Sequence, residues 1–563
     1  MKVVENFYTK KKFDPILPGP GDWPVVQLSK NRKAFIEEVT TESMERIKAL
    51  KPRRNSLIEE LELTHYKEKL RIAQNPWKVD PEDEYFFWNM VKSRLLEISA
   101  NGQESSNGEE ELLREIIFRY ATEITGNFKR TSYRMARSMV TFWFARLLNA
   151  SRIKRFGSFW SNELTLQDKI HVTGEIDLLR DLAKIGTIVI VPTHFSNLDS
   201  VLIGYIIHTL GLPPFIYGAG LNLFNIELFA YFMNSLGAYK VDRRKKNLLY
   251  LETLKSYSTQ AILKGCHSLF FPGGTRSRSG KIEKSLKLGL LGTAIEAQRL
   301  LFQRNPENMS NKIFIVPVVL NYNFVLEAPS LINDYLKQQG QERYYIENDE
   351  YSTSYKIIKF LFSFFTKGSD ISVSIGHAMD LFGNEVDNKG YSKDKQGRVI
   401  NTRDYFMSNG QITHDYQREM EYTRSLSDHI VKKFHQLNQV FHSHLVAYVA
   451  FKLIEKRYYK LDLFSLLRLP EEDLIIDYQL FKDAFLRLRQ VILEMSDDDQ
   501  LQVAPNLTGE VDQVISNGID NVGMYHAKRA IMKNKQGDIT TQDLNILYYY
   551  HNRLDGYDLQ KYF

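Results

Sequence analysis

The chain has 563 residues, and its 74 Lys and Arg against 68 Asp and Glu give a formal net charge of +6. So small a charge on so long a chain excludes a dedicated nucleic-acid-binding protein, and a content of 43% hydrophobic and 25% charged residues excludes a disordered or low-complexity chain. We therefore expect two or three folded domains and no nucleic-acid partner.

The N-terminal region, residues 1–170, is predicted to be mostly helical. Four prolines between positions 15 and 24 predict an extended start, and apolar spacing over 34–50 and 81–99 predicts amphipathic helices. No secretory signal pattern opens the sequence, and the single cysteine, Cys266, cannot form an internal disulfide and is expected to be buried. These features favour a cytoplasmic protein.

The segment 127–160 contains eight Lys and Arg residues, eight aromatic residues and no acidic residue. Such a basic, amphipathic segment suits the surface of an anionic bilayer, where each cation contributes about 1 kcal/mol. The alternative is a helix that packs its aromatic side chains into the core and leaves its arginines solvated. The longest uncharged run, 200–226, is interrupted by glycines and prolines and is a poor fit to a membrane-spanning helix.

From 171 to 410 the pattern predicts an α/β domain with a largely parallel or mixed sheet flanked by helices. Apolar runs predict strands at 187–191, 268–271, 313–320 and 371–375. The polar segment 380–415 is expected to be an excursion from this domain. Residues 411–563 return to helical periodicity, for example over 422–459 and 477–495.

The first motif, residues 188–203, reads as a buried strand, a polar turn and the start of a helix. Ligands of open α/β sheets bind at the carboxyl ends of the strands. With His194 in the turn and Asp199 in the first helical turn, the carboxylate can reach one imidazole nitrogen and leave the other to accept a proton from a hydroxyl. The alternative is a capping box over residues 196–199 without a chemical role.

Three further motifs follow in the chain. The third motif, residues 268–281, is a strand that enters a glycine turn bearing Arg276 and Arg278, which predicts a phosphate-bearing substrate or, alternatively, a solvated basic loop. The second motif, residues 237–246, is another cationic cluster, a pattern that is more often a surface charge run. The fourth motif, residues 313–320, is an apolar strand interrupted by Pro317, which is more often core than site.

In order and spacing, these four motifs resemble the motif blocks of the glycerolipid acyltransferase superfamily. The matching residues are His194 and Asp199 for the His-x4-Asp pair, Arg243 for the second block, Gly274, Arg276, Ser277 and Arg278 for the Gly-x-Arg-Ser block, and Pro317 for the fourth. Gly273 stands where most members have glutamate. The segments 219–223, 382–406 and 548–553 are most similar to the large glycerol-3-phosphate and dihydroxyacetone-phosphate acyltransferases, whereas residues 241–243 look more like the lysophosphatidate branch.

This resemblance implies transfer of a fatty acyl group from acyl-CoA or acyl carrier protein to glycerol 3-phosphate or lysophosphatidate, without a further cofactor. It implies catalytic roles for His194 and Asp199 and substrate binding by Arg243, Gly274, Arg276, Ser277 and Arg278. It also implies peripheral association with an anionic membrane surface. The alternative from another class, motivated by Gly273, is a catalytically weak lipid- or acyl-carrier-binding scaffold.

No metal site is expected. His429, His435, His442 and His444 fall on one predicted helix, and only His435 and His442 share a face. Two helical turns separate that pair by about 10 Å, which is too far for one metal ion.

Overall fold

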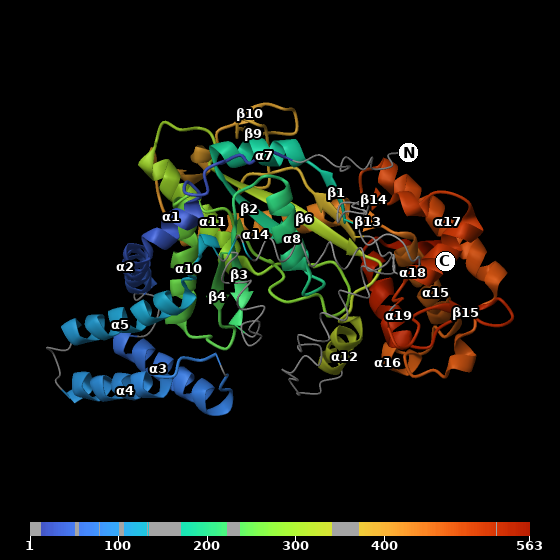
Figure 1. Ribbon diagram of the computed structural model, residues 1–563, viewed down its shortest axis with the longest axis horizontal. Helices are drawn as coiled ribbons and strands as arrows, with labels where there is room; N and C mark the ends of the chain where they lie inside the picture. Colours follow the sequence, from blue (N-terminus) through green and yellow to red (C-terminus); the bar gives the residue numbers. More distant parts are fainter. Residues whose placement is uncertain are drawn as a thin grey trace.

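A seven-stranded mixed sheet lies at the centre of the fold (Figure 1), which confirms the α/β prediction. In spatial order the strands are β1 (Ile170–Gly174), β7 (Ile371–Ile375), β6 (Ile313–Tyr322), β2 (Thr187–Pro192), β5 (Ser268–Leu269), β3 (Ile216–Gly220) and β4 (Ala238–Val241). β6 and β7 are antiparallel, and every other neighbouring pair is parallel. The computed structural model describes residues 13–50, 56–77, 79–100, 106–131, 133, 135, 170–221, 237–339, 371–524 and 526–563.

Strand β2 shows how both faces of the sheet are covered. Ile188 and Ile190 pack into one hydrophobic core, and Val189 and Val191 pack into another. Helices α7 (Ile176–Ile185) and α8 (Asp199–Thr209) contribute to the first core, and α11 (Leu288–Arg304) and α14 (Tyr416–Leu437) contribute to the second. Because side chains alternate between the faces of a strand, a central strand covered on both sides is apolar throughout.

The predicted strands at 187–191, 313–320 and 371–375 are confirmed, and β2 and β6 are one and two residues longer than expected. The strand predicted at 268–271 is wrong at its end, because β5 stops at Leu269. Pro272 has no N–H to extend the ladder, and the ring of Phe271 stacks on the imidazole of His194 with ring centroids 4.0 Å apart. The sequence did not predict β1, β3 and β4; the glycines of β3 weaken its strand pattern.

The described part of the N-terminal region is helical and packs against α10 (Leu248–Leu263) through a core that includes Leu61, Trp88 and Tyr250. The helices predicted over 34–50 and 81–99 are confirmed, with ends shifted by up to three residues. The N-terminal helices are α1 (Pro24–Lys30), α2 (Arg32–Leu50), α3 (Leu57–Gln74), α4 (Glu84–Ala100) and α5 (Ser106–Ile124).

A buried ion network joins these helices to the loop after β4. Arg244 pairs with Asp80 and with Asp242, the latter at 2.7 Å, and Lys245 lies 2.5 Å from Glu123. The side chains of Arg244 and Lys245 are only 6% and 2% exposed. These two residues of the second motif are therefore not part of a surface charge run, as such clusters usually are; they attach the N-terminal helices to the sheet.

The segment 380–415 does not leave the α/β domain, contrary to the expectation. Asp380 is buried and accepts a 2.6 Å hydrogen bond from Ser392, Thr402 donates to Asn311 at 2.8 Å, and the ring of Phe406 is fully buried. These groups hold the segment on the domain, since buried polar side chains need their partners. Its short elements are β8 (Glu385–Val386), β9 (Ser392–Lys393), β10 (Val399–Ile400), the 3-10 helix Thr402–Phe406, β11 (Met407–Ser408) and β12 (Gln411–Ile412).

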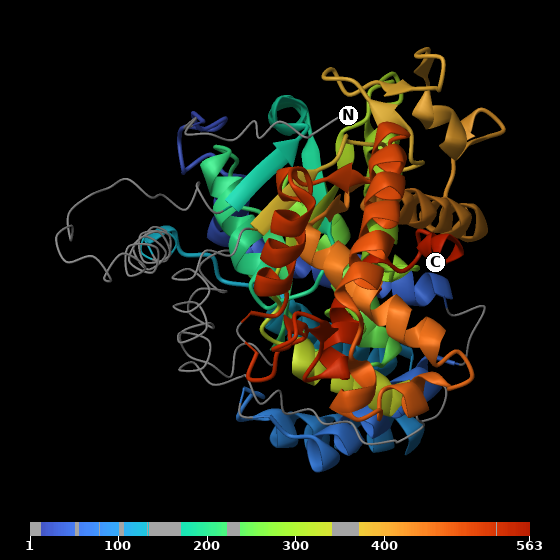
Figure 2. The ribbon, with the colours of Figure 1, turned by 90° about the vertical axis from the view of Figure 1, so that its right-hand side faces the viewer.

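The C-terminal helices that follow α14 share the hydrophobic core of the α7–α8 side of the sheet, and in Figure 2 they stand in front of it. The predicted helix over 422–459 is wrong, because α14 ends at Leu437 and β13 (Gln439–Val440) pairs with β14 (Gln502–Val503) before α15 begins at His442. The other elements are α15 (His442–Arg457), α16 (Leu463–Leu466), α17 (Tyr478–Asp497), α18 (Val511–Asn521), β15 (Met532–Lys533), β16 (Ile539–Thr540) and α19 (Leu544–His551).

Two classes of feature are absent from the described residues. None of their helices is both long enough and apolar enough to cross a membrane. Nor do they contain a cluster of three His, Cys, Asp or Glu side chains that could hold a metal ion.

The C-terminal tail holds the third motif in place. Asn552 donates a 2.8 Å hydrogen bond to the carbonyl of Ser279, and the ammonium of Lys281 lies 2.8 Å from the carboxylate of Asp555. Between them, Gly280 has a left-handed φ of 82°, and a Cβ added to it would lie 2.2 Å from the carbonyl oxygen of Tyr549.

Gly280→Ala should therefore destabilise the protein more than Gly→Ala at another left-handed glycine that has no close neighbour. Gly397, with φ of 80° and no neighbour within 4 Å, is the matched control. Gly397→Ala should lower the free energy of unfolding by about 1 kcal/mol through left-handed strain, and Gly280→Ala by at least about 1 kcal/mol more through overpacking. Denaturant unfolding measures both, and equal losses would contradict the close contact with the tail.

Candidate active site

The site lies where four strands end at the same edge of the sheet. β2, β4, β5 and β6 run in the same direction, so their carboxyl ends meet at one edge. His194 follows β2, Arg243 follows β4, the arginines of the third motif follow β5, and Tyr322 ends β6. The topology thus brings all four motifs to one place.

The imidazole of His194 is oriented by Asp199, as the spacing of the first motif predicted. His194 Nδ1 lies 2.8 Å from Asp199 Oδ2, and the ring stacks on Phe271. Because the carboxylate can only accept, Nδ1 carries the hydrogen in the neutral ring and Nε2 keeps a lone pair. Nε2 has no hydrogen-bond partner among the described residues, so it can accept a proton.

The carboxylate of Asp199 is fully buried and has three further donors. Oδ2 accepts the N–H groups of Phe195 at 2.7 Å and Ser196 at 3.0 Å, and Oδ1 accepts the hydroxyl of Tyr322 at 2.5 Å. Burial and the adjacent charge of Asp199 raise the pKa of Tyr322, so this hydroxyl stays a donor. Only half of the capping box is formed: Asp199 accepts the N–H of Ser196, but the N–H of Asp199 donates to the carbonyl and not to the hydroxyl of Ser196.

Arg243, Arg276 and Arg278 are brought together from two motifs. Partial desolvation, and then the like charges of Arg276 and Arg278, lower the pKa of the Arg243 guanidinium even though its side chain remains exposed. Arg276 pairs with Glu327 at 3.3 Å. Among the described residues, neither Arg243 nor Arg278 has a carboxylate partner. A group of three guanidinium groups, two of them without a carboxylate partner among the described residues, suits the binding of a phosphate or another anion.

Gly274 and Ser277 shape the turn that carries these arginines. Gly274 has a left-handed φ of 78° and donates its N–H to the carbonyl of Phe271 at 3.0 Å. Ser277 donates its N–H to the carbonyl of His194 and its hydroxyl to the carbonyl of Lys281, both at 2.7 Å. These donors are used within the protein, and they link the third motif directly to the first.

Glu327 is a site residue that the sequence reasoning missed. It is 3% exposed, and it accepts hydrogen bonds from the hydroxyl of Ser196 at 3.1 Å and the N–H of Asn197 at 2.9 Å in addition to its pair with Arg276. Its carboxylate therefore connects the turn of the first motif to the third motif. In the sequence, the only indication of this role is that Glu327 is a lone acidic residue in the apolar run that follows the strand of the fourth motif.

Arg553 reaches the site from the C-terminal tail; the sequence marks it only as part of the segment 548–553, which resembles the large acyltransferases. Its guanidinium lies 4.0 Å from the ring centre of Phe195 and donates to the carbonyl of Leu320 at 2.6 Å. Burial lowers its pKa to about 10. It supplies positive charge behind the turn that carries His194.

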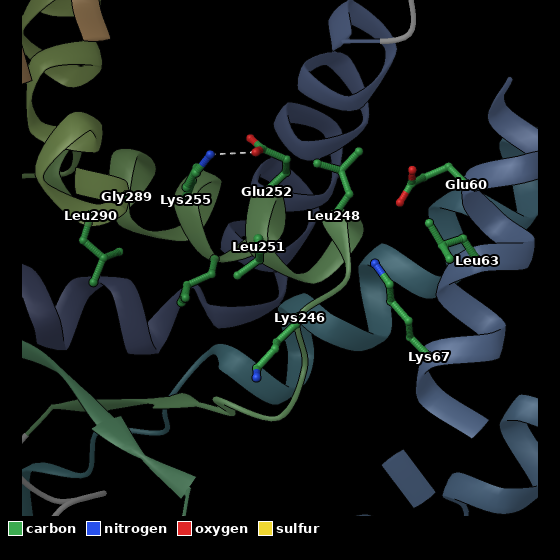
Figure 3. A pocket seen from close by; sticks show the side chains of 11 residues that line it. Glu60, Leu63, Lys67, Lys246, Leu248, Leu251, Glu252, Lys255, Gly289 and Leu290 are labelled. Carbon is green, nitrogen blue, oxygen red and sulfur yellow. Dashed lines mark hydrogen bonds and ion pairs between the residues drawn. The ribbon is translucent and has the colours of Figure 1, made fainter. Parts of the chain in front are cut away.

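A cavity of about 380 Å³ lies between α3, α10 and α11 (Figure 3). Lys246 in the second motif and Leu290, which follows the third motif, are on its wall. Neither Lys67 nor Lys246 has an ion-pair partner among the described residues, whereas Lys255 pairs with Glu252 at 2.7 Å. The lining residues are Glu60, Leu63, Lys67, Lys246, Leu248, Leu251, Glu252, Leu254, Lys255, Gly289 and Leu290.

Comparisons with known proteins indicate the same class of enzyme as the four motifs. Residues 169–321 match the family model described as "Acyltransferase". The chain is 27% identical over 277 residues to a glycerol-3-phosphate acyltransferase of Pseudoalteromonas translucida and 26% identical over 267 residues to one of Shewanella sp. (strain ANA-3). The matches cover 49% and 47% of this chain but only 30% and 29% of the relatives. Residues 169–321 thus match an acyltransferase domain whose four motifs meet at one sheet edge, and the relatives support the glycerolipid acyltransferase superfamily.

Proposed function

We propose that this chain is a glycerol-3-phosphate O-acyltransferase, which moves a fatty acyl group from an acyl thioester to a hydroxyl of glycerol 3-phosphate in phospholipid synthesis. The observation that carries the proposal is the juxtaposition of a carboxylate-oriented imidazole, His194, with two arginines, Arg243 and Arg278, that have no carboxylate partner among the described residues. The names of the two relatives support the same acceptor.

His194 acts as the general base. Its Nε2 takes the proton of the acceptor hydroxyl while the oxygen attacks the thioester carbonyl carbon. A C–O bond forms, the C–S bond breaks, and the imidazolium returns the proton to the departing thiolate. Asp199 stabilises the transient imidazolium and holds the ring in the required tautomer. A thioester is already activated, so this chemistry requires no serine or cysteine nucleophile.

Arg243, Arg276 and Arg278 bind the phosphate of the acceptor. Guanidinium groups match phosphate oxygens in pairs, and a bound phosphate relieves the repulsion that lowers the pKa of Arg243. Fixing the phosphate also places the hydroxyl near His194, which reduces the entropic part of the barrier. Gly274 and Ser277 contribute by setting the turn that presents Arg276 and Arg278.

The acyl donor is acyl-CoA or acyl carrier protein, and the leucines and lysines of the cavity in Figure 3 suit an apolar chain with an anionic end. We place the reaction at the cytoplasmic face of an anionic membrane, with peripheral attachment. The composition of the segment 127–160 supports this on sequence grounds. In its described residues, 127–131, 133 and 135, Phe128 and Tyr133 are buried in the N-terminal core and Lys129 and Arg130 are exposed, as in the core-packed alternative.

His194→Ala should lower kcat by about 10² to 10⁴-fold without loss of folding, because the general base is removed. Purified protein with anionic vesicles is offered glycerol 3-phosphate and lysophosphatidate in parallel, with coenzyme A and carrier-protein donors, and released thiol and acylated product are measured. His429→Ala, an exposed histidine on α14, is the control. Consumption of lysophosphatidate alone would show that the protein is a lysophosphatidate acyltransferase. If no combination of donor and acceptor reacts, the lipid- or acyl-carrier-binding scaffold becomes the favoured alternative.

Arg243→Ala should raise the KM for the acceptor by about 10 to 100-fold, because a charge-assisted phosphate contact is lost. The KM for the donor should change little. This position is better suited than Arg276, whose removal would leave the buried Glu327 without its cation. Arg398→Ala, on a side chain that is 77% exposed, is the matched control. Equal increases for both substrates would contradict a phosphate site.

A further inference from the structure

A carboxylate that the mechanism above does not use, on the half-buried side chain of Glu283, contacts the main chain of His194. Glu283, just after the third motif, accepts the backbone N–H of His194 at Oε1 over 3.4 Å. Its other oxygen, Oε2, is buried and has no hydrogen-bond partner among the described residues. A buried carboxylate oxygen without a hydrogen-bond partner lowers the free energy of unfolding. Such a group in a native protein is often explained by a functional role.

Glu283 occupies the space that a side chain at position 273 would fill. A Cβ added to Gly273 would lie 3.0 Å from Glu283 Oε1 and 3.1 Å from its Cγ. The backbone of Gly273 is not left-handed, so the conformation itself would accept a side chain there. Glycine at 273 and glutamate at 283 are thus complementary: the missing side chain makes room for a carboxylate from ten residues further along the chain.

The titratable groups around Glu283 come from the first motif and from the C-terminal tail. His194 and Asp199 face it from the first motif, and Arg553 faces it from the tail. Burial raises the pKa of Glu283 to about 7, while Asp199 acts in the same direction and Arg553 opposes it. The carboxyl group therefore changes its charge near neutral pH, beside the residue that becomes positive during acyl transfer.

We propose that Glu283 is a positioning residue for His194, fixing its main chain and placing a second negative charge behind the imidazole, in the space left by Gly273. The role rests on the proposed function, since it concerns the imidazolium formed in that reaction. The ionised form stabilises this cation and the neutral form does not.

Glu283→Gln tests the charge without changing the shape, because the amide oxygen can still accept from His194. The ratio of wild-type to variant kcat should be near one at pH 5.5 and should rise about tenfold as pH increases through 7. Glu82→Gln, at an exposed position, should give a constant ratio of one. A ratio that does not change with pH would overturn the proposal.

An exchange of positions tests the shared space. Gly273→Glu alone should reduce activity, because two carboxylates then compete for one volume, and Glu283→Ala alone should also reduce it. The double variant should recover at least tenfold over Glu283→Ala, since the carboxylate returns from position 273. A double variant no better than Glu283→Ala would overturn the proposal.

Thermal unfolding separates this proposal from the proposed function. A folded-state pKa raised to about 7 means that wild-type stability falls as pH rises towards 7, whereas Glu283→Gln lacks this loss. The Tm of Glu283→Gln should exceed that of wild type at pH 8 and match it at pH 5. If wild type transfers no acyl group but the Tm difference between the two proteins still increases from pH 5 to pH 8, the proposed function fails and the placement of Glu283 stands. A Tm difference that is the same at pH 5 and pH 8 overturns that placement.

Discussion

The buried carboxylate of Asp199 is the charge on which the site depends. A fully buried ion must be matched by donors, and Asp199 receives the imidazole of His194, two backbone N–H groups and the hydroxyl of Tyr322. Leaving one such partner unmatched costs about 1–3 kcal/mol. These donors belong to the turn after β2 and to the end of β6. The two strands therefore fix the carboxylate of Asp199, and this carboxylate fixes the imidazole of His194.

The helical regions on either side of the sheet complete this arrangement. The N-terminal region neutralises Arg244 and Lys245 through Asp80 and Glu123, whereas Arg243 keeps no carboxylate partner among the described residues. From the other side, the tail fixes the third motif through Asn552. Residues far from the reacting atoms thus decide which charges remain available to a ligand.

Much of this could be read from the sequence, for physical reasons. Largely apolar strands such as β2 and β6 stand out because both faces are covered, and the strand–turn–helix pattern brings His194 and Asp199 within reach. Glu327, Glu283 and Arg553 could not be assigned, since their roles arise from contacts across more than 80 residues of chain. Helical periodicity also continues through the short strand β13, so the break between α14 and α15 left no signal.

In the proposed reaction the arginines bind a phosphate so that a hydroxyl of the same molecule meets His194. A crystal structure with glycerol 3-phosphate bound tests it most directly. We expect the phosphate within hydrogen-bond distance of Arg243 and Arg278, and a carbinol oxygen within about 3 Å of His194 Nε2. A phosphate bound elsewhere, or a hydroxyl directed away from His194 while the phosphate occupies the arginines, would contradict the account.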